Sequence, residues 1–384
     1  MKIGIFTNNY LPNPYGVSSS VESFRKEFER MGHEAFVFAP KWKGYRDKNP
    51  RVFRYPAIET SIKIKFPLAI PYSLKIHKIL KDLNLDIIHS QHPNLLGGAA
   101  ARWACKYNIP LVFTWHTLYD QYTHFVPFVP KKIAMRWVIR NAVKYANRAD
   151  AVVTPTPSVI DIIRGWGVTN KNIYSVPTGV EEKQFENPDR ESVRRKYNIA
   201  DNEVLLFVMT RLTAEKNVDF LLEAAIPILQ GNKLAKFMIC GDGNLKNILE
   251  EKVVEAGLGE KVIFVGIVSG AEKKNYYAAG DIFVYASKSE TQGMILTEAM
   301  YSGLPIVAVR ATGVKDIIES EKTGFLVDEN KNEFAGVVQK LIDNENLRVK
   351  FSEEAKRVAR KKYTSQVCAG KVMEIYERTV ENHK

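Results

Sequence analysis

Residues 289–300 read SETQGMILTEAM, and they stand between two short apolar runs at residues 282–285 and 305–308. Both runs have the composition of buried strands, so we predict a strand, a glycine loop, a helix and a second strand. A loop that opens a helix presents backbone N–H groups and a positive dipole end to an anion such as a diphosphate. Glu290 precedes this helix and Glu298 lies inside it. We expect the two carboxylates to contact separate parts of one elongated ligand; the alternative is that Glu290 caps the helix and Glu298 faces solvent.

The same alternation extends along the chain and predicts an α/β architecture. Further strand-like runs occur in the first half at residues 2–7, 35–39, 86–89, 111–114 and 151–154, and in the second half at residues 204–209, 236–240 and 262–265. Amphipathic helical segments lie between them, for example at residues 21–31, 218–229 and 245–256. We therefore predict two Rossmann-like, doubly wound domains at residues 1–178 and 179–364. They would be joined near residues 177–200, where the pattern changes to a polar stretch at residues 181–195. Residues 365–384 are predicted to form a terminal helix that packs back toward the first domain.

Composition excludes several classes of protein. The chain has 384 residues, 45% of them hydrophobic and 26% charged, as in a soluble protein with a core. It has no apolar run long enough to cross a bilayer and no signal-peptide pattern at its start, so we expect a cytoplasmic location. Its three cysteines are far apart, which predicts neither disulfides nor a zinc site. The sequence contains no P-loop, G-x-S-x-G, HExxH or Asp-x-Asp motif, and we expect no bound metal.

Positive charge is concentrated in the first half. Residues 1–180 carry a net charge of +14, and residues 181–384 carry −2. A second feature is a set of cations at four-residue spacing beside Trp137, which on a helix would form one slowly winding stripe: Lys132, Arg136, Arg140, Lys144 and Arg148. The stretch between Glu59 and Asp82 is also rich in lysine and free of acids. Such basic amphipathic segments are typical of helices that lie on anionic lipid; a solvated helix face is the alternative.

Further candidate residues follow predicted strands, at the edge where α/β sheets bind ligands. Arg211 and Lys216 supply a guanidinium and an ammonium that suit a pair of phosphates, and a surface ion pair with Glu215 is the alternative. Gly16 follows the first strand and would let backbone approach a ligand closely. His116 ends another strand, where an isolated histidine is more often structural than catalytic.

Together these features resemble the retaining glycosyltransferases of family 4, which have the GT-B fold: two Rossmann-like domains that face each other across a cleft. The resemblance covers nearly the whole chain. It implies a catalytic set of Glu290, His116, Arg211 and Lys216. It also implies a donor-binding set of Gly16, Arg211, Lys216, Val268, Glu290, Gly293, Met294, Ile295, Leu296 and Glu298.

The resemblance also implies a role for each group. Glu298 would bind the ribose of a nucleotide sugar, and Glu290 the hydroxyls of the transferred sugar. Arg211 and Lys216 would hold the diphosphate, while His116 would lie beside the donor sugar. A donor phosphate oxygen takes the acceptor's proton in this family, so we expect no dedicated base. Glu290 has two alternative roles, as a nucleophile or as a shield for the cationic sugar.

The first half, chiefly residues 8–17 and 116–127, looks like the bacterial diacylglycerol glucosyltransferases of this family, which are monotopic and use UDP-glucose. This implies transfer of a hexose, α-glucosyl, from UDP-glucose to diacylglycerol or a related glycolipid on an anionic, cytoplasmic membrane face, with no metal or other cofactor. The residues expected to face the acceptor or membrane are Tyr119, His124, Phe125, Lys132, Arg136, Trp137 and Arg140. The alternatives are a GDP-mannose or other donor with a phosphatidylinositol or soluble acceptor, an inactive sugar-nucleotide binder, and a nucleic-acid-binding protein. The oligomeric state is left open.

Overall fold

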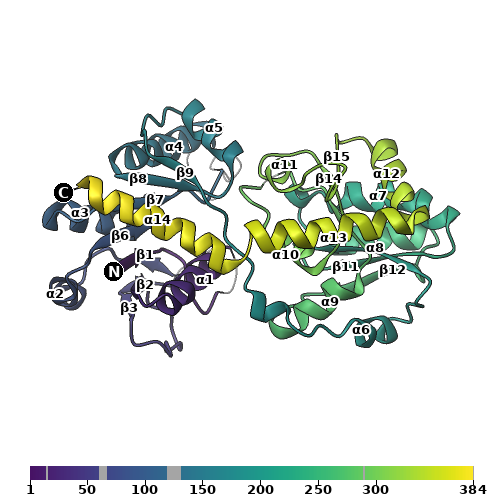
Figure 1. Cartoon of the computed structure of the whole chain (residues 1–384), viewed down its shortest axis with the longest axis horizontal. Coiled ribbons are helices and arrows are strands. Elements are labelled where there is room, and N and C mark those ends of the chain that lie inside the picture. The colour runs from purple at the N-terminus through teal and green to yellow at the C-terminus, as the bar shows by residue number, and fades with distance from the viewer. Residues whose placement is uncertain (14–15, 60–66, 119–130, 289, 384) are drawn as a thin grey trace. The chain divides into compact units, whose positions relative to one another are not determined.

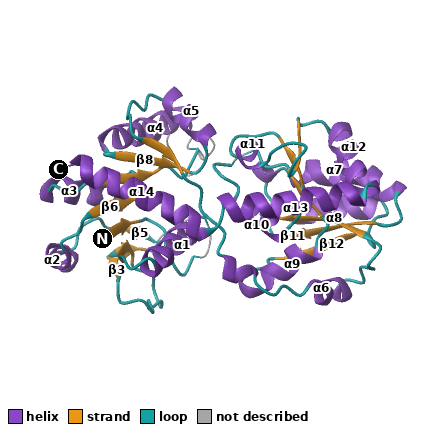
Figure 2. Ribbon diagram, in the orientation of Figure 1, coloured by secondary structure: helices purple, strands orange, loops and turns teal. Residues whose placement is uncertain are grey.

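The computed structural model describes residues 1–13, 16–59, 67–118, 131–288 and 290–383. The chain divides into two compact units (Figure 1). Unit 1 comprises Met1–Gly179 and Ser365–Lys384, and unit 2 comprises Val180–Thr364. Each unit is built on a parallel sheet with helices packed against it (Figure 2).

Unit 1 contains a seven-stranded sheet in the order β3-β2-β1-β6-β7-β8-β9. All neighbouring strands in it are parallel. The winding reverses between β1 and β6, and ligands of α/β sheets bind at the carboxyl ends of strands at such a point. Its strands are β1 (Lys2–Phe6), β2 (Glu34–Pro40), β3 (Val52–Tyr55), β6 (Ile87–Ser90), β7 (Leu111–Thr114), β8 (Ala151–Thr154) and β9 (Ile173–Ser175), and a small antiparallel pair is formed by β4 (Ala57–Ile58) and β5 (Leu68–Ala69).

The helices of unit 1 include the last one of the chain. They are α1 (Val17–Arg30), α2 (Leu74–Leu83), α3 (Leu96–Tyr107), α4 (Lys131–Arg148), α5 (Pro157–Gly165) and α14 (Ser365–His383). In Figure 1 α14, in yellow, lies beside α1, and the rings of Phe28 and Tyr376 are 5.5 Å apart in the core. The predicted start of the first helix was wrong. Gly16 is its N-cap, so the serines at residues 18–20, expected ahead of the helix, lie within it.

Unit 2 contains a six-stranded parallel sheet in the order β12-β11-β10-β13-β14-β15. This is the doubly wound order of a Rossmann fold, with its switch point between β10 and β13. The strands are β10 (Val204–Met209), β11 (Ala235–Cys240), β12 (Val262–Gly266), β13 (Ile282–Tyr285), β14 (Ile306–Val309) and β15 (Gly324–Val327). Every residue of β10 and β13 is buried, because helices cover both faces of the sheet.

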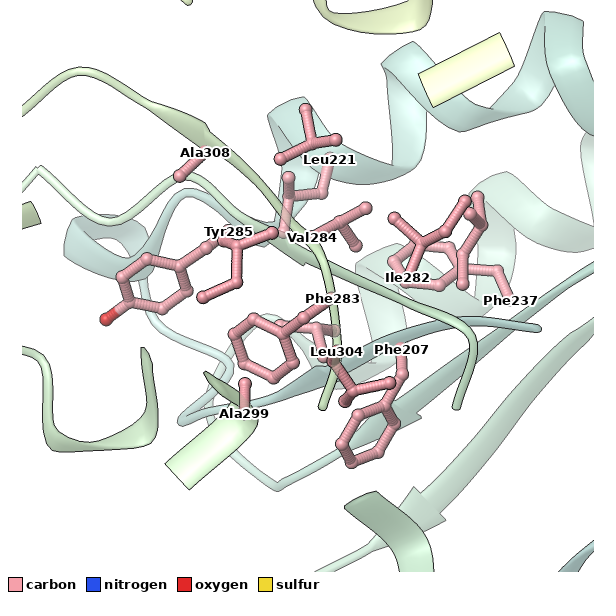
Figure 3. Packing of buried hydrophobic residues seen from close by; sticks show 14 of the residues in the cluster. Phe207, Leu221, Phe237, Ile282, Phe283, Val284, Tyr285, Ala299, Leu304 and Ala308 are labelled. Atoms are coloured by element: carbon pink, nitrogen blue, oxygen red, sulfur yellow. The ribbon is translucent and has the colours of Figure 1, made fainter. Parts of the chain in front are cut away.

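Helices of unit 2 pack around this central pair of strands. They are α6 (Arg190–Lys196), α7 (Val218–Gly231), α8 (Lys246–Glu255), α9 (Lys273–Ala279), α10 (Met294–Ser302), α11 (Val314–Ile317), α12 (Lys331–Asp343) and α13 (Glu345–Lys362), with short 3-10 turns at Glu182–Phe185, Ala214–Lys216 and Gly270–Glu272. Figure 3 shows the core around Phe207 and Phe283. Tyr285 lies at the edge of this cluster, with its hydroxyl directed away from the aliphatic side chains.

The edge strands and the polar stretch also differ from the sequence prediction. Strands β3, β9 and β15 were not predicted, and each lies at an edge of its sheet. Strands β3 and β9 are short and lack the continuous apolar run that marked the central strands, whereas β15 was missed although its four residues are apolar. The polar stretch at residues 181–195 is not a simple linker, because it contains most of α6. Within it Arg194 is only 2% exposed and pairs with Asp281 at 3.1 Å.

Candidate active site

The loops that follow β10 and β13 meet at the switch point of unit 2. The backbone N–H of Lys288 donates to the carbonyl of Glu215 at 3.0 Å. The Oγ of Ser287 lies 3.4 Å from the same carbonyl oxygen. These contacts join the two loops and place Lys216, expected at the diphosphate, in contact with Glu290, expected at the transferred sugar.

Glu290 is held by three donors on one carboxylate oxygen. Lys216 and Tyr285 contact its Oε1, and Ser287 Oγ donates to the same atom at 3.0 Å. The side chains of Lys216 and Glu290 are only 13% and 12% exposed. Burial and the charge of Glu290 raise the pKa of Tyr285 well above its usual value, so the phenol stays protonated and donates. Because Oε1 is saturated, a ligand hydroxyl would bind Oε2.

Arg211 lies on the same loop as Lys216 but is held loosely. Its Nη2 is 3.3 Å from Glu215, and the two side chains are 63% and 40% exposed. The surface ion pair considered for Arg211 therefore exists, whereas Lys216 pairs with Glu290. Because an exposed ion pair contributes about 0–1 kcal/mol, an incoming phosphate can displace Glu215 from Arg211.

Helix α10 begins at the glycine loop, as predicted. Gly293 is its N-cap and has a φ of 72°, a left-handed conformation that glycine adopts without strain. No described side chain caps this end, so the capping role considered for Glu290 is wrong. The amides of Met294 and Ile295 belong to the first turn, where helices bind anions. The amide of Leu296 differs, because it donates to the carbonyl of Gly293 at 2.8 Å.

Glu298 occupies a separate and equally enclosed position. Its side chain is 12% exposed, so the alternative of a solvated helix residue is wrong. Lys273 contacts both of its oxygens, with Nζ 2.5 Å from Oε1, and the Tyr277 hydroxyl donates to Oε2 at 2.8 Å. Burial, followed by the charge of Glu298, raises the pKa of Tyr277 well above its usual value and keeps its proton in place.

The ring of Phe283 packs between the two tyrosines that donate to the site carboxylates, Tyr277 and Tyr285. The ring of Phe283 stacks on Tyr277, with centroids 6.0 Å apart, and lies 6.2 Å from the ring of Tyr285. All three rings are buried in the core of unit 2. The tyrosine hydroxyls at the two ends of this row are therefore held at fixed positions.

Val268, expected near the base, lies two residues beyond β12. It is half-buried against the core of unit 2, and its neighbour Ile267 is 64% exposed. Among the described residues, no group of three or more His, Cys, Asp and Glu side chains is arranged to hold a metal ion.

In unit 1 the loops after β1, β6 and β7 are joined by hydrogen bonds. Gly16 is the N-cap of α1 with a φ of 56°. The backbone N–H of Asn8 donates to His92 Nδ1 at 3.1 Å, and His116 Nε2 lies 2.7 Å from Gln91 Oε1. The two residues that the sequence singled out in this half, Gly16 and His116, thus lie on one edge of the sheet.

Three histidines near this edge are uncharged at neutral pH. Burial lowers the pKa of His89 and His116 to about 3 and that of His92 to about 4. The ring of His89 is bonded on both sides, to Tyr376 at 2.5 Å and to Thr114 at 2.6 Å. A neutral His116 can form hydrogen bonds with a ligand but supplies no positive charge.

The basic segment expected at a membrane forms α4. Ile133 and Trp137 on this helix are 60% and 61% exposed. Its described cations are also exposed: Arg136, Arg140, Lys144 and Arg148. Tyr119, His124 and Phe125 lie outside the described residues, as does the side chain of Lys132. None of the described helices is long and apolar enough to cross a membrane.

Comparison with known proteins finds a matching family model for each half of the chain. A family model described as "Glycosyltransferase Family 4" matches residues 14–184, and one described as "Glycosyl transferases group 1" matches residues 189–358. An alpha-monoglucosyldiacylglycerol synthase of Streptococcus pneumoniae is 30% identical over 88% of this chain and 77% of its own. The chain belongs to glycosyltransferase family 4. A GDP-mannose-dependent alpha-mannosyltransferase of Corynebacterium glutamicum is 28% identical over 85% of this chain and 77% of its own.

The fold of this family 4 enzyme matches solved structures. Sucrose-phosphate synthase from Thermosynechococcus elongatus aligns with a TM-score of 0.81 at 18% identity, over 100% of both chains. The predicted GT-B fold is therefore confirmed. The protein is a glycosyltransferase, and the names of its relatives indicate a hexosyltransferase.

The sequence did not point to the residues that hold the two carboxylates of this family 4 enzyme. They are Tyr285 and Ser287 at Glu290, and Lys273 and Tyr277 at Glu298. One available signal was the spacing of Lys273 and Tyr277, which places them on one face of a helix. Both tyrosines otherwise have the pattern of ordinary core residues.

Proposed function

We propose that this family 4 enzyme transfers an α-glucosyl group from UDP-glucose to diacylglycerol or a related membrane glycolipid, with retention of configuration. The observation that carries the proposal is the contact of Lys216 with Glu290 beside the loop that opens α10. It combines a cation for a phosphate with a carboxylate for a sugar hydroxyl. The 30% identity to an alpha-monoglucosyldiacylglycerol synthase supports the choice of donor and acceptor.

Stabilising the leaving diphosphate is the main task of the site. Breaking the sugar–phosphate bond places negative charge on the diphosphate, and fixed positive groups near it lower the barrier. The ammonium of Lys216 has three N–H groups, so it can keep Glu290 and also donate to a phosphate oxygen. Arg211 would exchange its exposed contact with Glu215 for the same phosphate. The first-turn amides of α10 would add a third source of positive charge, and we propose that no metal is required.

Glu290 would act on the transferred sugar. Its Oε2 would accept a sugar hydroxyl, while the three donors on Oε1 keep the carboxylate in place. Those donors spread the negative charge, which favours an electrostatic role for Glu290 over a nucleophilic one. A donor phosphate oxygen would take the acceptor's proton, so that the acceptor attacks from the face that the diphosphate leaves. His116 would then contribute a hydrogen bond to the donor sugar as a neutral ring.

A lipid acceptor requires a membrane-facing surface, and unit 1 carries features that suit one. Helix α4 exposes Trp137 between Arg136 and Arg140. Exposed apolar side chains also lie on β4, on β5, at the start of α2 and on the segment between β5 and α2: Ile58, Leu68, Ile70, Tyr72 and Leu74. Cations that contact anionic lipid beside apolar residues at the acyl boundary are typical of peripheral membrane proteins. We place the enzyme on the cytoplasmic face of the membrane.

The test is a matrix of donors and acceptors. The full chain is incubated with UDP-glucose, UDP-galactose or GDP-mannose and with vesicles of anionic lipid that contain diacylglycerol or phosphatidylinositol, and the product is identified by mass and linkage. We expect α-glucosyldiacylglycerol from UDP-glucose, at the same rate with and without EDTA. Product from GDP-mannose alone would instead support the rival reaction, which the similarity to the Corynebacterium mannosyltransferase favours. Absence of product from every donor would contradict both.

A further inference from the structure

Lys273, Tyr277 and Glu298 form a closed set of contacts in unit 2. We propose that Lys273 is a specificity-determining residue, which makes this site select a ribonucleoside diphosphate over its 2′-deoxy form. It does so by holding Glu298 in one orientation and by supplying a second hydrogen bond to the ribose. The inference rests on the proposed function and on the role that the family resemblance implies for Glu298, which is to bind the ribose of the donor.

The geometry leaves Glu298 little freedom. Lys273 and Tyr277 lie four residues apart on α9, and so on the same face of that helix. Lys273 contacts both carboxylate oxygens, while the Tyr277 hydroxyl donates to Oε2 at 2.8 Å. The Nζ of Lys273 also lies 5.8 Å from the centre of the Tyr277 ring, over its face. Because Tyr277 is fully buried, the carboxylate is held between a fixed hydroxyl and an ammonium.

The hydrogen-bonding positions that remain on Glu298 and Lys273 match the two hydroxyls of a ribose. A carboxylate has about four lone-pair positions, and the contacts with Lys273 and Tyr277 occupy three of them. One position remains for a ligand hydroxyl that donates. The ammonium of Lys273 has three N–H groups, and its two contacts with Glu298 leave about one N–H that can donate to a ligand oxygen. The cis-diol of ribose supplies one hydroxyl for each, whereas a 2′-deoxyribose leaves one of the two positions without a partner.

Charge gives Lys273 a second effect. Glu298 is an anion in a site that is expected to bind a diphosphate, and two negative groups repel each other. Lys273 balances the charge of Glu298 next to it, just as Lys216 balances that of Glu290. The side chain of Lys273 is 25% exposed, so replacing it removes the charge without opening the core.

The experiment compares Lys273→Met with Lys274→Met in the full chain. The control removes the same charge at the next position, where the lysine donates to the carbonyl of Glu186 instead. Isothermal titration measures the affinity for uridine diphosphate and 2′-deoxyuridine diphosphate, or for the guanosine pair if the wild type prefers it. Turnover is measured separately at saturating donor.

For Lys273→Met we expect affinity for the ribonucleotide to fall about ten-fold, with a smaller loss for the deoxynucleotide and a smaller loss of turnover at saturating donor. Lys274→Met should match the wild type. Unchanged affinity in Lys273→Met, tighter binding, or an equal loss for both nucleotides would overturn the inference. If the wild type binds neither the uridine nor the guanosine diphosphate, the proposed function fails instead.

Discussion

The two units use their charged residues in opposite ways. In unit 2 the buried acids of the site each contact a lysine and a tyrosine, and residues 181–384 carry a net charge of only −2. Residues 1–180 carry +14, and no described residue forms an ion pair with the cations of α4: Arg136, Arg140, Lys144 and Arg148. A small ligand with fixed geometry needs paired, buried groups, whereas attraction to an extended anionic surface needs exposed cations. The contrast is the one expected if unit 2 holds the proposed donor site and the exposed cations of α4 form the proposed membrane-docking surface.

The units also differ in their titrating and fluorescent residues. All seven histidines and all five tryptophans of the chain belong to unit 1. Tryptophan fluorescence thus reports on unit 1 alone. Lowering the pH protonates histidines of unit 1, and tryptophan fluorescence follows the unfolding of that unit. The stability of unit 1 can therefore be measured within the intact protein.

The largest effect is expected from acid, which should destabilise unit 1. The folded-state pKa values of His89, His92 and His116 are about 3, 4 and 3, below the ordinary value near 6.5 of an unfolded chain. The unfolded state therefore binds protons first as pH falls. Stability is complete above about pH 6.5 and is lost progressively toward pH 3–4, by about 2 kcal/mol for each histidine at pH 5.

Urea unfolding followed by tryptophan fluorescence, at pH 7 and pH 5, measures this loss. Far-ultraviolet circular dichroism should retain a second, less pH-sensitive transition from unit 2. His89→Gln should flatten the pH dependence, while His77→Gln, a half-buried position beside Trp103, should leave it as in the wild type. The same fluorescence midpoint at both pH values would contradict the burial of three neutral rings.

The next largest effect is expected from Lys216→Met. The variant removes a cation from the leaving group and leaves the buried Glu290 without its charge partner, so turnover should fall about 100- to 1000-fold. Steady-state kinetics with the donor that gives product in the donor–acceptor test measures the loss. Lys288→Met is the matched control, because that lysine lies on the adjoining loop and pairs with Glu329 at the surface. Equal losses in both variants would mean that nonspecific charge, rather than the site, governs turnover.

A smaller effect tests the docking surface. Arg136→Gln combined with Arg140→Gln should weaken partition onto vesicles of anionic lipid about 30-fold, since each cation near the surface contributes about 1 kcal/mol. Donor affinity should not change. The control replaces Lys350 and Lys361, two exposed cations on α13 of unit 2. If that control loses as much binding, the positive charge of unit 1 has no special role at the membrane.

The smallest effect is expected from Tyr285→Phe. It removes one of the three donors to Glu290 Oε1 and leaves Lys216 and Ser287, so turnover should fall only about ten-fold. Tyr276→Phe provides the comparison, because its hydroxyl contacts Lys196 and Tyr197 away from the site. A wild-type rate for Tyr285→Phe would show that the lysine and the serine suffice to hold Glu290.

Much of the fold could be predicted because central strands of parallel sheets are continuous apolar runs. The bounds predicted for β7, β8, β10 and β13 agree with the structure, and those strands lie inside their sheets. The edge strands β3 and β9 escaped prediction because they are short, only partly buried and mixed in composition, whereas β15 was missed although it is apolar and mostly buried. Arg194 escaped because a buried arginine has no signature in the sequence that distinguishes it from one at the surface.

The sequence predicted the charged residues of the site, but only some of the contacts between them and their partners. Arg211, Lys216, Glu290 and Glu298 stand out because they follow buried strands or lie on the helix after the glycine loop. Their tyrosine partners do not, because Tyr277 and Tyr285 share the apolar pattern of the core around them. The carboxylates are held in part by the hydroxyls of these two tyrosines. The positions of the hydroxyls depend on how the buried rings pack in the core.

The order of residues along the chain established where strands end and which charges stand beside those ends, because burial and turn chemistry are local properties. It did not establish which charges meet. Lys216 is next to Glu215 in the sequence and 74 residues from Glu290, yet it contacts Glu290. The reason is that β10 and β13, although distant in sequence, are neighbours in the sheet. Their pairing brings the two loops together and thereby creates the site.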